Sequence, residues 1–577
     1  MMNCVKDRSK SNEKKKQRNR LFGSVARKGL ALLLVASSLS GVACRTSPSE
    51  NPGGSVPSET KDAESSFSSK ATSGQLIPSA SEVPTPSWEG KDLFAASEKD
   101  SVCSIVIKAE ENAGMLGAFT GSVDSDKQNI RLTLPGSMDV SRLVFYAKHD
   151  SGKESGPYLA DFTDRKNKAN KQFLSPYGKG SISVNVLKLP ALMLTIDETH
   201  GTFQDVLDSR NHSVYAYGDM MLSVPEAMAQ EKGWSNVYLS RDKTEDTPKS
   251  CSIRGRGNAT WRDFDKRPFH LHTENNLNLL GMGSEKNWAL LANALDASRL
   301  RNELFYNLAV DMGLEYSPEC RSIDVFVDGK YLGIYLLTET VKFGRNRINI
   351  DRNQDFLYEI DHYFFGERYA FSTKMGTRIT FHNPEAGFAE AKNTLEKIEQ
   401  AIYDTESEDF LNYIDVDAFA RYYLLQELSL NYDVLKGSGF MYYRQSDGKL
   451  HPGPVWDMDN TLAVYDTGPH MNTEGVYAGE RSWFKPLLQQ PAFVSAVVRV
   501  YYEEGVRELF AALPEKLQAY SVENRLSVLL DHTLYPVYRH PYSETNGASY
   551  GMDVSYVKRV LMARLRWIDS YLATLQG

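Results

Sequence analysis

Short runs of alternating or β-branched hydrophobic residues dominate the chain between Ser101 and about Leu189. Gly, Asp, Ser and Lys residues separate the runs, and no long segment there has hydrophobic residues at helical spacing. The runs are Ser104–Ile107, Ile130–Leu134, Leu143–Tyr146 and Ile182–Val186. Period-two runs divided by turn residues are typical of the strands of a sandwich. We therefore predict a small all-β domain, an Ig-like sandwich, over residues 96–189, with the role of a stalk or adhesion module.

Beyond Pro190 the pattern mixes helical and strand periods. Every fourth residue from Leu300 to Met312 is hydrophobic and Gly313 follows as a stop, which predicts a helix over residues 296–312. Alternating residues on both sides of Asp328-Gly329 predict a β-hairpin with a two-residue turn. Further helices are predicted over residues 417–428 and 553–577. We therefore expect an α+β domain over residues 190–577.

A basic leader followed by a hydrophobic run occupies the first 44 residues. The run from Leu30 to Ala43 is shorter than the roughly 20 residues that a membrane-spanning helix needs, so it is typical of a signal peptide. Residues 39–44 resemble a bacterial lipobox, which makes Cys44 the predicted site of lipidation. Gly41 stands where Leu is usual, so plain cleavage after Ala43 and an uncleaved anchor stay open. We expect an exported protein, anchored to the membrane by lipid on its extracytoplasmic face.

The segment that follows, residues 45–95, is rich in Ser, Thr, Pro, Gly and Glu. Such a composition cannot bury enough apolar surface to offset the entropy of ordering, so we predict a disordered linker. The whole chain has 577 residues and a net charge of −8, and no basic block occurs outside the leader. Nucleic acid is therefore an unexpected partner. Cys103, Cys251 and Cys320 match no zinc motif, and either three free thiols or one Cys251–Cys320 disulfide is compatible with the sequence.

Candidate chemistry lies in two acidic stretches near residues 431–460. A predicted helix leads into Asp433, two short β segments follow, and the second delivers Asp457 and Asp459 at its end. Protein kinases use this layout: one Asp accepts the proton of the attacking hydroxyl, a polar residue five positions on helps to hold metal, and a later Asp binds Mg²⁺. Ser438 stands at the five-position spacing. Hard oxygen ligands are what Mg²⁺ prefers.

Three other readings of the second acidic stretch are possible. Residues 457–461 fit the D-x-D-x-T signature of haloacid-dehalogenase phosphatases, but the 116 residues after Thr461 have a mainly helical pattern, without the βα units which that fold requires. D-x-D is also a metal motif of some glycosyltransferases. Solvated loop carboxylates would give the same spacing without any chemistry. No Walker A loop is present in the sequence.

A set of separate stretches resembles the spore-coat protein H (CotH) family of kinases, and they occur in the family's order. They are Ser252–Trp261, Lys266–Phe269, Leu279–Gly281, Trp288–Asn293, Asp296 with Arg301 and Asn302, Tyr331–Glu339, Leu357–Asp361, Asn431 with Asp433, and Gly453–Asp459. The resemblance implies an atypical protein-kinase-like fold that uses ATP and Mg or Mn to phosphorylate Ser or Thr of surface or coat proteins.

The resemblance also implies roles for single residues. Arg254, Gly255, Gly257 and Asn258 would belong to a loop over the phosphates, Lys266 would reach the α,β-phosphates, and Glu339 would lie at the nucleotide pocket. Asp433 and Asp457 would be the catalytic carboxylates, with Asp457, Asp459 and Ser438 as metal ligands. The alternative roles are a tight turn for the glycines, a solvated strand lysine for Lys266, and structural ion pairs for Glu339 and Arg301.

Two departures from the pattern keep a second hypothesis open. Ser438 is a poorer metal ligand than the Asn of kinases, and Asn460-Thr461 replace an aromatic or small residue followed by Gly. An exported kinase must also find ATP outside the cytoplasm. The alternative to an active kinase is therefore a catalytically weak or inactive kinase fold that serves as a surface scaffold or adhesin.

Overall fold

A computed structural model of the protein describes residues 100–124, 129–163, 172–175, 178–237, 250–362, 367–464, 472–537 and 549–576. All of these ranges belong to one compact unit, residues 73–577. The predicted signal peptide with Cys44 and the predicted linker lie outside the described residues. Within the described ranges, no helix combines the length and the hydropathy that a membrane crossing requires.

The N-terminal part is a seven-stranded sheet in the order β5-β4-β1-β2-β3-β7-β6. Its strands are β1 (Val102–Ile107), β2 (Phe119–Asp124), β3 (Asn129–Leu134), β4 (Leu143–His149), β5 (Glu154–Ala160), β6 (Gln172–Ser175) and β7 (Gly178–Val186). The four hydrophobic runs of the sequence lie in β1, β3, β4 and β7, and most of their buried residues belong to one core. All neighbouring strands are antiparallel except β3 and β7. The predicted strand-rich region ahead of the main domain is therefore confirmed.

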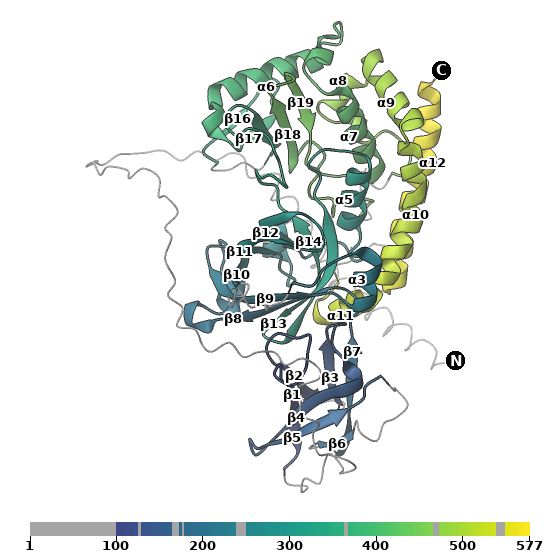
Figure 1. Ribbon diagram of the computed structural model, residues 1–577. Coiled ribbons are helices and arrows are strands. Elements are labelled where there is room, and N and C mark those ends of the chain that lie inside the picture. Colours follow the sequence, from purple (N-terminus) through teal and green to yellow (C-terminus); the bar gives the residue numbers. More distant parts are fainter. Residues whose placement is uncertain are drawn as a thin grey trace, which may run out of the picture. The chain divides into compact units, whose positions relative to one another are not determined.

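A closed barrel follows, in the order β10-β11-β12-β14-β13-β8-β9 (Figure 1). Its strands are β8 (Ala191–Ile196), β9 (Tyr215–Ser223), β10 (Ser250–Gly255), β11 (Phe269–Asn278), β12 (Ser284–Leu291), β13 (Cys320–Val327) and β14 (Lys330–Glu339). Short helices α2 (Phe203–Asp208), α3 (Glu226–Lys232) and α4 (Ala259–Asp263) lie between its strands. Inward-facing residues such as Ile253, Leu271 and Trp288 are fully buried and fill the barrel.

The predicted hairpin is confirmed as β13 and β14. Asp328 and Gly329 form its turn with φ angles of 49° and 70°, the left-handed values that a two-residue type I′ turn requires. A Cβ on Gly329 would lie 1.9 Å from the backbone oxygen of Ala118, in the N-terminal sheet region. Glycine is therefore required both by the turn and by this close approach.

The N-terminal sheet and the barrel share a hydrophobic core. Met193, Met221 and Phe326 of the barrel belong to the same buried cluster as Phe119 of β2. The rings of Phe119 and Phe326 pack edge to face with centroids 5.3 Å apart. Ser137 and Ser223 are joined by a hydrogen bond of 2.7 Å between their hydroxyls. The two parts are thus packed together through an apolar interface.

The C-terminal part combines a five-stranded sheet with a group of helices. The sheet has the order β16-β17-β15-β18-β19, with strands β15 (Phe356–Ile360), β16 (Ala370–Ser372), β17 (Arg378–Phe381), β18 (Gly439–Arg444) and β19 (Lys449–Pro452). The helices are α5 (Arg301–Asp311), α6 (Phe388–Tyr403), α7 (Val416–Ser429), α8 (Phe484–Leu487), α9 (Pro491–Glu503), α10 (Val506–Glu523), α11 (Arg525–Leu534) and α12 (Tyr550–Leu575). Helix α7 packs against α5, α9 and α12 (Figure 1). The predicted α+β class is confirmed.

The helix predicted over residues 296–312 begins later, at Arg301. Asp296 explains the difference, because its carboxylate accepts hydrogen bonds from the backbone N–H groups of Ser298, Leu300 and Arg301 at 2.8–2.9 Å. A carboxylate that binds the backbone in this way favours a turn over a helix. The helix ends where the sequence predicted, just before Gly313, which has φ 70°.

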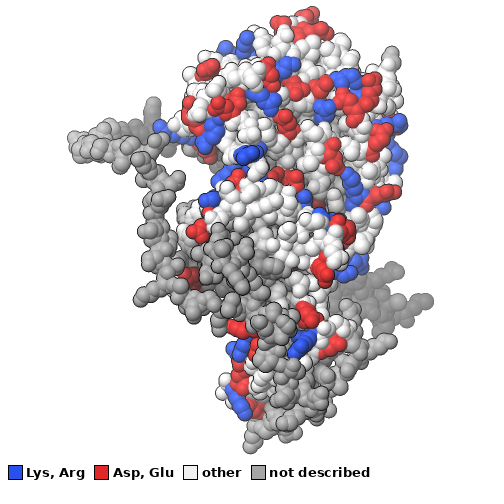
Figure 2. Space-filling model, in the orientation of Figure 1, with Lys and Arg blue, Asp and Glu red and all other residues white. Residues whose placement is uncertain are grey.

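Charged side chains of opposite sign are mixed on one face of the molecule (Figure 2). Over the face of the described residues that Figure 2 shows, Lys and Arg side chains are interspersed with Asp and Glu. Cys103, Cys251 and Cys320 are free thiols. Neither the charge on this face nor the cysteines indicate a site.

Candidate functional site

The two acidic stretches follow helix α7 and strand β19. Helix α7 ends at Ser429, and the turn after it carries Asp433 and Ser438. The hairpin of β18 and β19 then leads to residues 456–463, which we call the acidic loop and which contain Asp457 and Asp459. The helix, turn, hairpin and loop predicted from the sequence are therefore present in this order.

Side-chain hydrogen bonds join the two stretches. Asn460 donates through Nδ2 to Oδ2 of Asp433 at 2.7 Å. The hydroxyl of Ser438 donates to Oδ2 of Asp457, also at 2.7 Å. The backbone N–H of Tyr432 donates to the backbone carbonyl oxygen of Asn460 at 3.2 Å. The turn after α7 and the acidic loop, which the hairpin separates in the chain, thus lie in contact, as the kinase layout requires.

The carboxylates of Asp433, Asp457 and Asp459 repel one another. Burial, together with the negative charges of Asp457, Asp296 and Asp433, raises the pKa of Asp459 to about 7. The pKa of Asp457 is raised mainly by desolvation, and Asp433 adds to the rise while Ser438 and Arg256 oppose it. A group of carboxylates that disfavours its own ionisation is stabilised by a bound cation.

Helix α5 holds the acidic loop from one side. Asn302 accepts a hydrogen bond from the N–H of Met458 at 2.8 Å, and the hydroxyl of Tyr306 accepts one from the N–H of Asp457 at 3.2 Å. Arg301 donates through Nε to the oxygen of Thr461 at 2.8 Å and forms an ion pair with Asp296. These contacts position the loop backbone and, with it, the two acids.

The backbone around the acids is strained. Leu430, Leu435, Ser438, Asp457 and Leu462 all have φ between 45° and 52°, in the left-handed region that non-glycine residues rarely adopt. Such conformations cost about 1–3 kcal/mol each and tend to cluster at functional sites. The concentration of strain in these two segments supports their assignment as a site.

A basic loop faces the acids from the barrel. Arg256 follows β10, lies with its guanidinium carbon 5.4 Å from the ring centre of Trp456, and interacts electrostatically with Asp457. Arg254 lies 5.6 Å from the ring of Tyr215, and its buried Nε has no hydrogen-bond partner. The sequence did not single out Arg256, although it stands in the middle of the predicted phosphate loop.

The two glycines of this loop are required for different physical reasons. A Cβ on Gly255 would lie 2.5 Å from the ring of Trp261, so that position needs close packing. Gly257 has φ 80°, which favours glycine by conformation. Asn258 is exposed and precedes α4 without a side-chain capping bond.

Lys266 and Glu339 have other partners. The ammonium group of Lys266 is fully buried and forms an ion pair of 2.6 Å with Asp531 of α11, which also binds Arg299 at 3.0 Å. Glu339 forms an ion pair with Arg347 and accepts the N–H of Glu319 at 2.8 Å. Their predicted contacts with nucleotide stay predictions, since both side chains engage protein groups in this structure.

The oxygen donors around Asp433, Asp457 and Asp459 fit a hard cation. Carboxylate, hydroxyl and amide oxygens gather there, and these are the ligands that Mg²⁺ and Mn²⁺ accept. In the described ranges, no three or more His, Cys, Asp and Glu side chains form a group that could hold a metal ion. A metal at this place would therefore need Ser438, Asn460 or phosphate oxygens beside the carboxylates.

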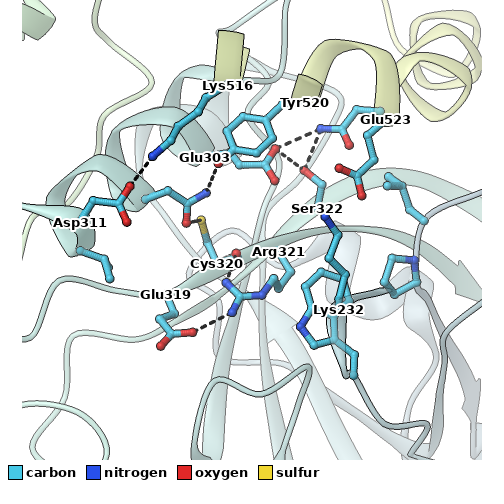
Figure 3. Close-up of a pocket in the computed structure, with 16 residues that line it drawn as sticks. Lys232, Glu303, Asp311, Glu319, Cys320, Arg321, Ser322, Lys516, Tyr520 and Glu523 are labelled. Carbon is cyan, nitrogen blue, oxygen red and sulfur yellow. Dashed lines mark hydrogen bonds and ion pairs between the residues drawn. The ribbon is translucent and has the colours of Figure 1, made fainter. Parts of the chain in front are cut away.

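A separate pocket lies between α5, β13 and α10, with a volume of about 400 Å³. None of the three acids lines it; Glu303, Asn307, Cys320, Ser322, Tyr520 and Asn524 do (Figure 3). Glu303 accepts hydrogen bonds from Ser322 and Asn524 at 2.8 and 3.0 Å. The pocket and the acidic loop thus lie against different residues of the same helix, α5.

Comparison with known proteins identifies a family for the part of the chain that contains these residues. A family model described as CotH kinase protein matches residues 253–568, which is more than half of the chain, and confirms the resemblance noted in the sequence. No curated protein matches the sequence. Among solved structures, the Helicobacter pylori proinflammatory kinase CtkA has 9% identity and a TM-score of 0.26, over 54% of this chain and 95% of that chain. At that TM-score the likeness supports no inference.

Proposed function

The chain belongs to the CotH kinase family, and from this premise we propose that it is an ATP-dependent protein kinase. It transfers the γ-phosphoryl group of ATP to Ser or Thr hydroxyls of surface or coat proteins, with Mg²⁺ or Mn²⁺ as the metal. The observation that carries the proposal is the hydrogen bond between Asn460 and Asp433, because it joins the acidic loop to the turn after α7.

Each acid has a distinct role in this proposal. Asp457, Asp459 and the hydroxyl of Ser438 hold the metal. A bound Mg²⁺ or Mn²⁺ supplies screening of the charge on the β,γ-phosphates. Asp433 is half-buried and therefore accessible to a substrate, and it accepts the proton of the attacking hydroxyl.

The basic loop binds the phosphates. Arg256 lies next to Asp457, so a polyphosphate between them would meet a guanidinium on one side and the metal on the other. Arg254, Gly255, Gly257 and Asn258 complete the loop, and the two glycines let its backbone take this path. We assign Lys266 and Glu339 no step, because their protein partners already satisfy them.

The leader places the reaction outside the cytoplasm. Cys44 carries the lipid that anchors the chain, and the segment over residues 45–95 separates the anchor from the folded part. Substrates are then hydroxyl-bearing proteins of the same surface or coat.

The test is phosphoryl transfer by the purified chain with labelled ATP and Mn²⁺ or Mg²⁺. We expect label on the chain itself or on a Ser-rich protein, and a loss of at least about 100-fold in Asp457→Asn and in Asp433→Asn. Asp409→Asn, an exposed acid of the same domain, is the matched control and should keep full activity.

The rival function is a scaffold or adhesin with a decayed site. Ser438, in place of Asn, is the residue that favours it. Transfer and nucleotide binding both absent at millimolar ATP, with the chain folded by circular dichroism, would leave this rival.

A further inference from the structure

We propose that the amide oxygen of Asn460 is a ligand of the divalent cation, and that it supplies the amide that protein kinases take from the Asn five residues after the catalytic Asp. The inference rests on the proposed function. It concerns a residue at which this chain departs from the pattern of its family, so the resemblance gives Asn460 no role.

The orientation of the Asn460 side chain is fixed by its neighbour. Its Nδ2 group donates to Oδ2 of Asp433 at 2.7 Å. A carboxylate only accepts hydrogen bonds, so the NH₂ end must face Asp433 and the oxygen must point the other way. The assignment of oxygen and nitrogen in this amide therefore follows from chemistry.

The amide oxygen itself is buried and accepts no hydrogen bond. Leaving a buried carbonyl oxygen without a partner costs about 1–3 kcal/mol. Most buried polar atoms in folded proteins have partners, and a bound ion is one explanation for an exception. Asn460 Oδ1 is such an exception, and the residue that carries it follows Asp459 in the chain.

The position of Asn460 is held by the backbone around it. Its own carbonyl oxygen accepts the N–H of Tyr432 at 3.2 Å, and the hydroxyl of Thr461 donates to the oxygen of Met458 at 2.7 Å. Arg301 holds the carbonyl of Thr461 at 2.8 Å. A ligand atom on a fixed backbone loses little entropy on binding.

The charges nearby select a cation as the partner. Asp457, Asp459 and Asp433 interact with one another electrostatically, so an anion would be repelled. Carboxylates together with an amide oxygen are a common ligand set for Mg²⁺ and Mn²⁺. The His, Cys, Asp and Glu side chains of the described ranges do not form a metal site by themselves. An amide oxygen adds the further ligand that the acids need.

Ser438 explains why the amide has to come from residue 460. The hydroxyl of Ser438, at the position where kinases have Asn, donates its proton to Asp457. It therefore orients the carboxylate of Asp457, while its oxygen stays available as the metal ligand proposed above, and serine has no amide to contribute. The acidic loop then contributes Asp457, Asp459 and Asn460 from four consecutive residues.

The test is Mn²⁺ binding to the whole chain, followed by electron paramagnetic resonance with and without a non-hydrolysable ATP analogue. We expect Asn460→Ala to weaken Mn²⁺ binding by about 10–100-fold, the range typical when a supporting group of a metal site is removed. Asn412→Ala, an exposed amide in the same domain, should leave the affinity unchanged.

A second variant separates a ligand from a merely structural residue. Asn460→Cys puts a soft thiolate at the site and should shift the preference from Mn²⁺ towards Cd²⁺, whereas Asn412→Cys should not. Wild-type affinity for Mn²⁺ in Asn460→Ala, with binding lost in Asp457→Asn, would overturn this inference alone. A wild-type chain without any Mn²⁺ affinity at millimolar concentration would overturn the proposed function as well.

Discussion

At the scale of single residues, buried acids without a cationic partner are the most informative side chains. Glu303 on α5 has 7% of its surface exposed and is bound by two neutral donors, Ser322 and Asn524. Burial raises its pKa to about 6; the two hydrogen bonds oppose the rise and Glu523 adds to it. The folded state therefore binds a proton at Glu303 more tightly than the unfolded chain does.

This preference predicts a pH-dependent stability. Since the pKa is higher in the folded than in the unfolded chain, the contribution is present at low pH and is lost as pH rises through about 6. Between pH 4 and pH 8, the free energy of unfolding of Glu303→Gln should gain about 2 kcal/mol relative to the wild type. Urea unfolding at both pH values measures this gain.

The matched control is Glu515→Gln, an exposed acid of α10. Its difference from the wild type should be the same at both pH values. Equal differences for Glu303→Gln and Glu515→Gln would contradict the interpretation of the buried acid.

At the scale of elements, the barrel and α11 are joined by a buried ion group. Lys266 precedes β11, Arg299 precedes α5, and both pair with Asp531. Burial lowers the pKa of Lys266 to about 8 although Asp531 opposes it. A Cβ on Gly333 of β14 would lie 2.4 Å from the Asp531 carboxylate, so glycine permits the helix to approach.

We therefore predict that Lys266→Met destabilises the chain and leaves nucleotide binding intact in the folded fraction. Removing one partner of a buried ion pair costs about 3–5 kcal/mol, because a buried charge is left uncompensated. Guanidinium unfolding gives the loss, and titration with ATP gives the affinity. The opposite result, full stability with weakened ATP binding, would instead support the phosphate contact that the family resemblance implies for Lys266.

Local periodicity accounts for the elements that the sequence predicted well. The hairpin of β13 and β14 and the helix α7 depend on residues close in the chain; the turn of the hairpin was predicted correctly at Asp328-Gly329, and α7 within one residue at each end. The start of α5 was missed because Asp296 binds the backbone ahead of it. The pairing of Lys266 with Asp531 and the orientation of Asn460 depend on residues far apart, which periodicity does not report.

At the scale of the whole molecule, the N-terminal sheet is a structural partner of the barrel. Met193, Met221 and Phe326 of the barrel are at most 1% exposed and share a core with Phe119. A stalk joined only by a linker would leave these side chains in water.

A chain that begins at residue 190 should therefore be less stable than one that begins at residue 96. Exposing three large apolar side chains costs about 5 kcal/mol or more, at 1.5–3 kcal/mol each. Thermal unfolding of the two truncated chains, together with the full chain as reference, measures the loss. Identical unfolding temperatures for all three would show that the shared core contributes nothing.

The order of contacts along the chain has a consequence for biosynthesis. Arg301 binds the acidic loop, and the hydroxyl of Tyr556 in α12 donates to the oxygen of Ala463 at the end of that loop. Helix α12 follows the loop in the chain, so the loop gains this support only after α12 has been synthesised. A nascent chain that has not yet reached Tyr556 would therefore lack one of the contacts that hold the acidic loop.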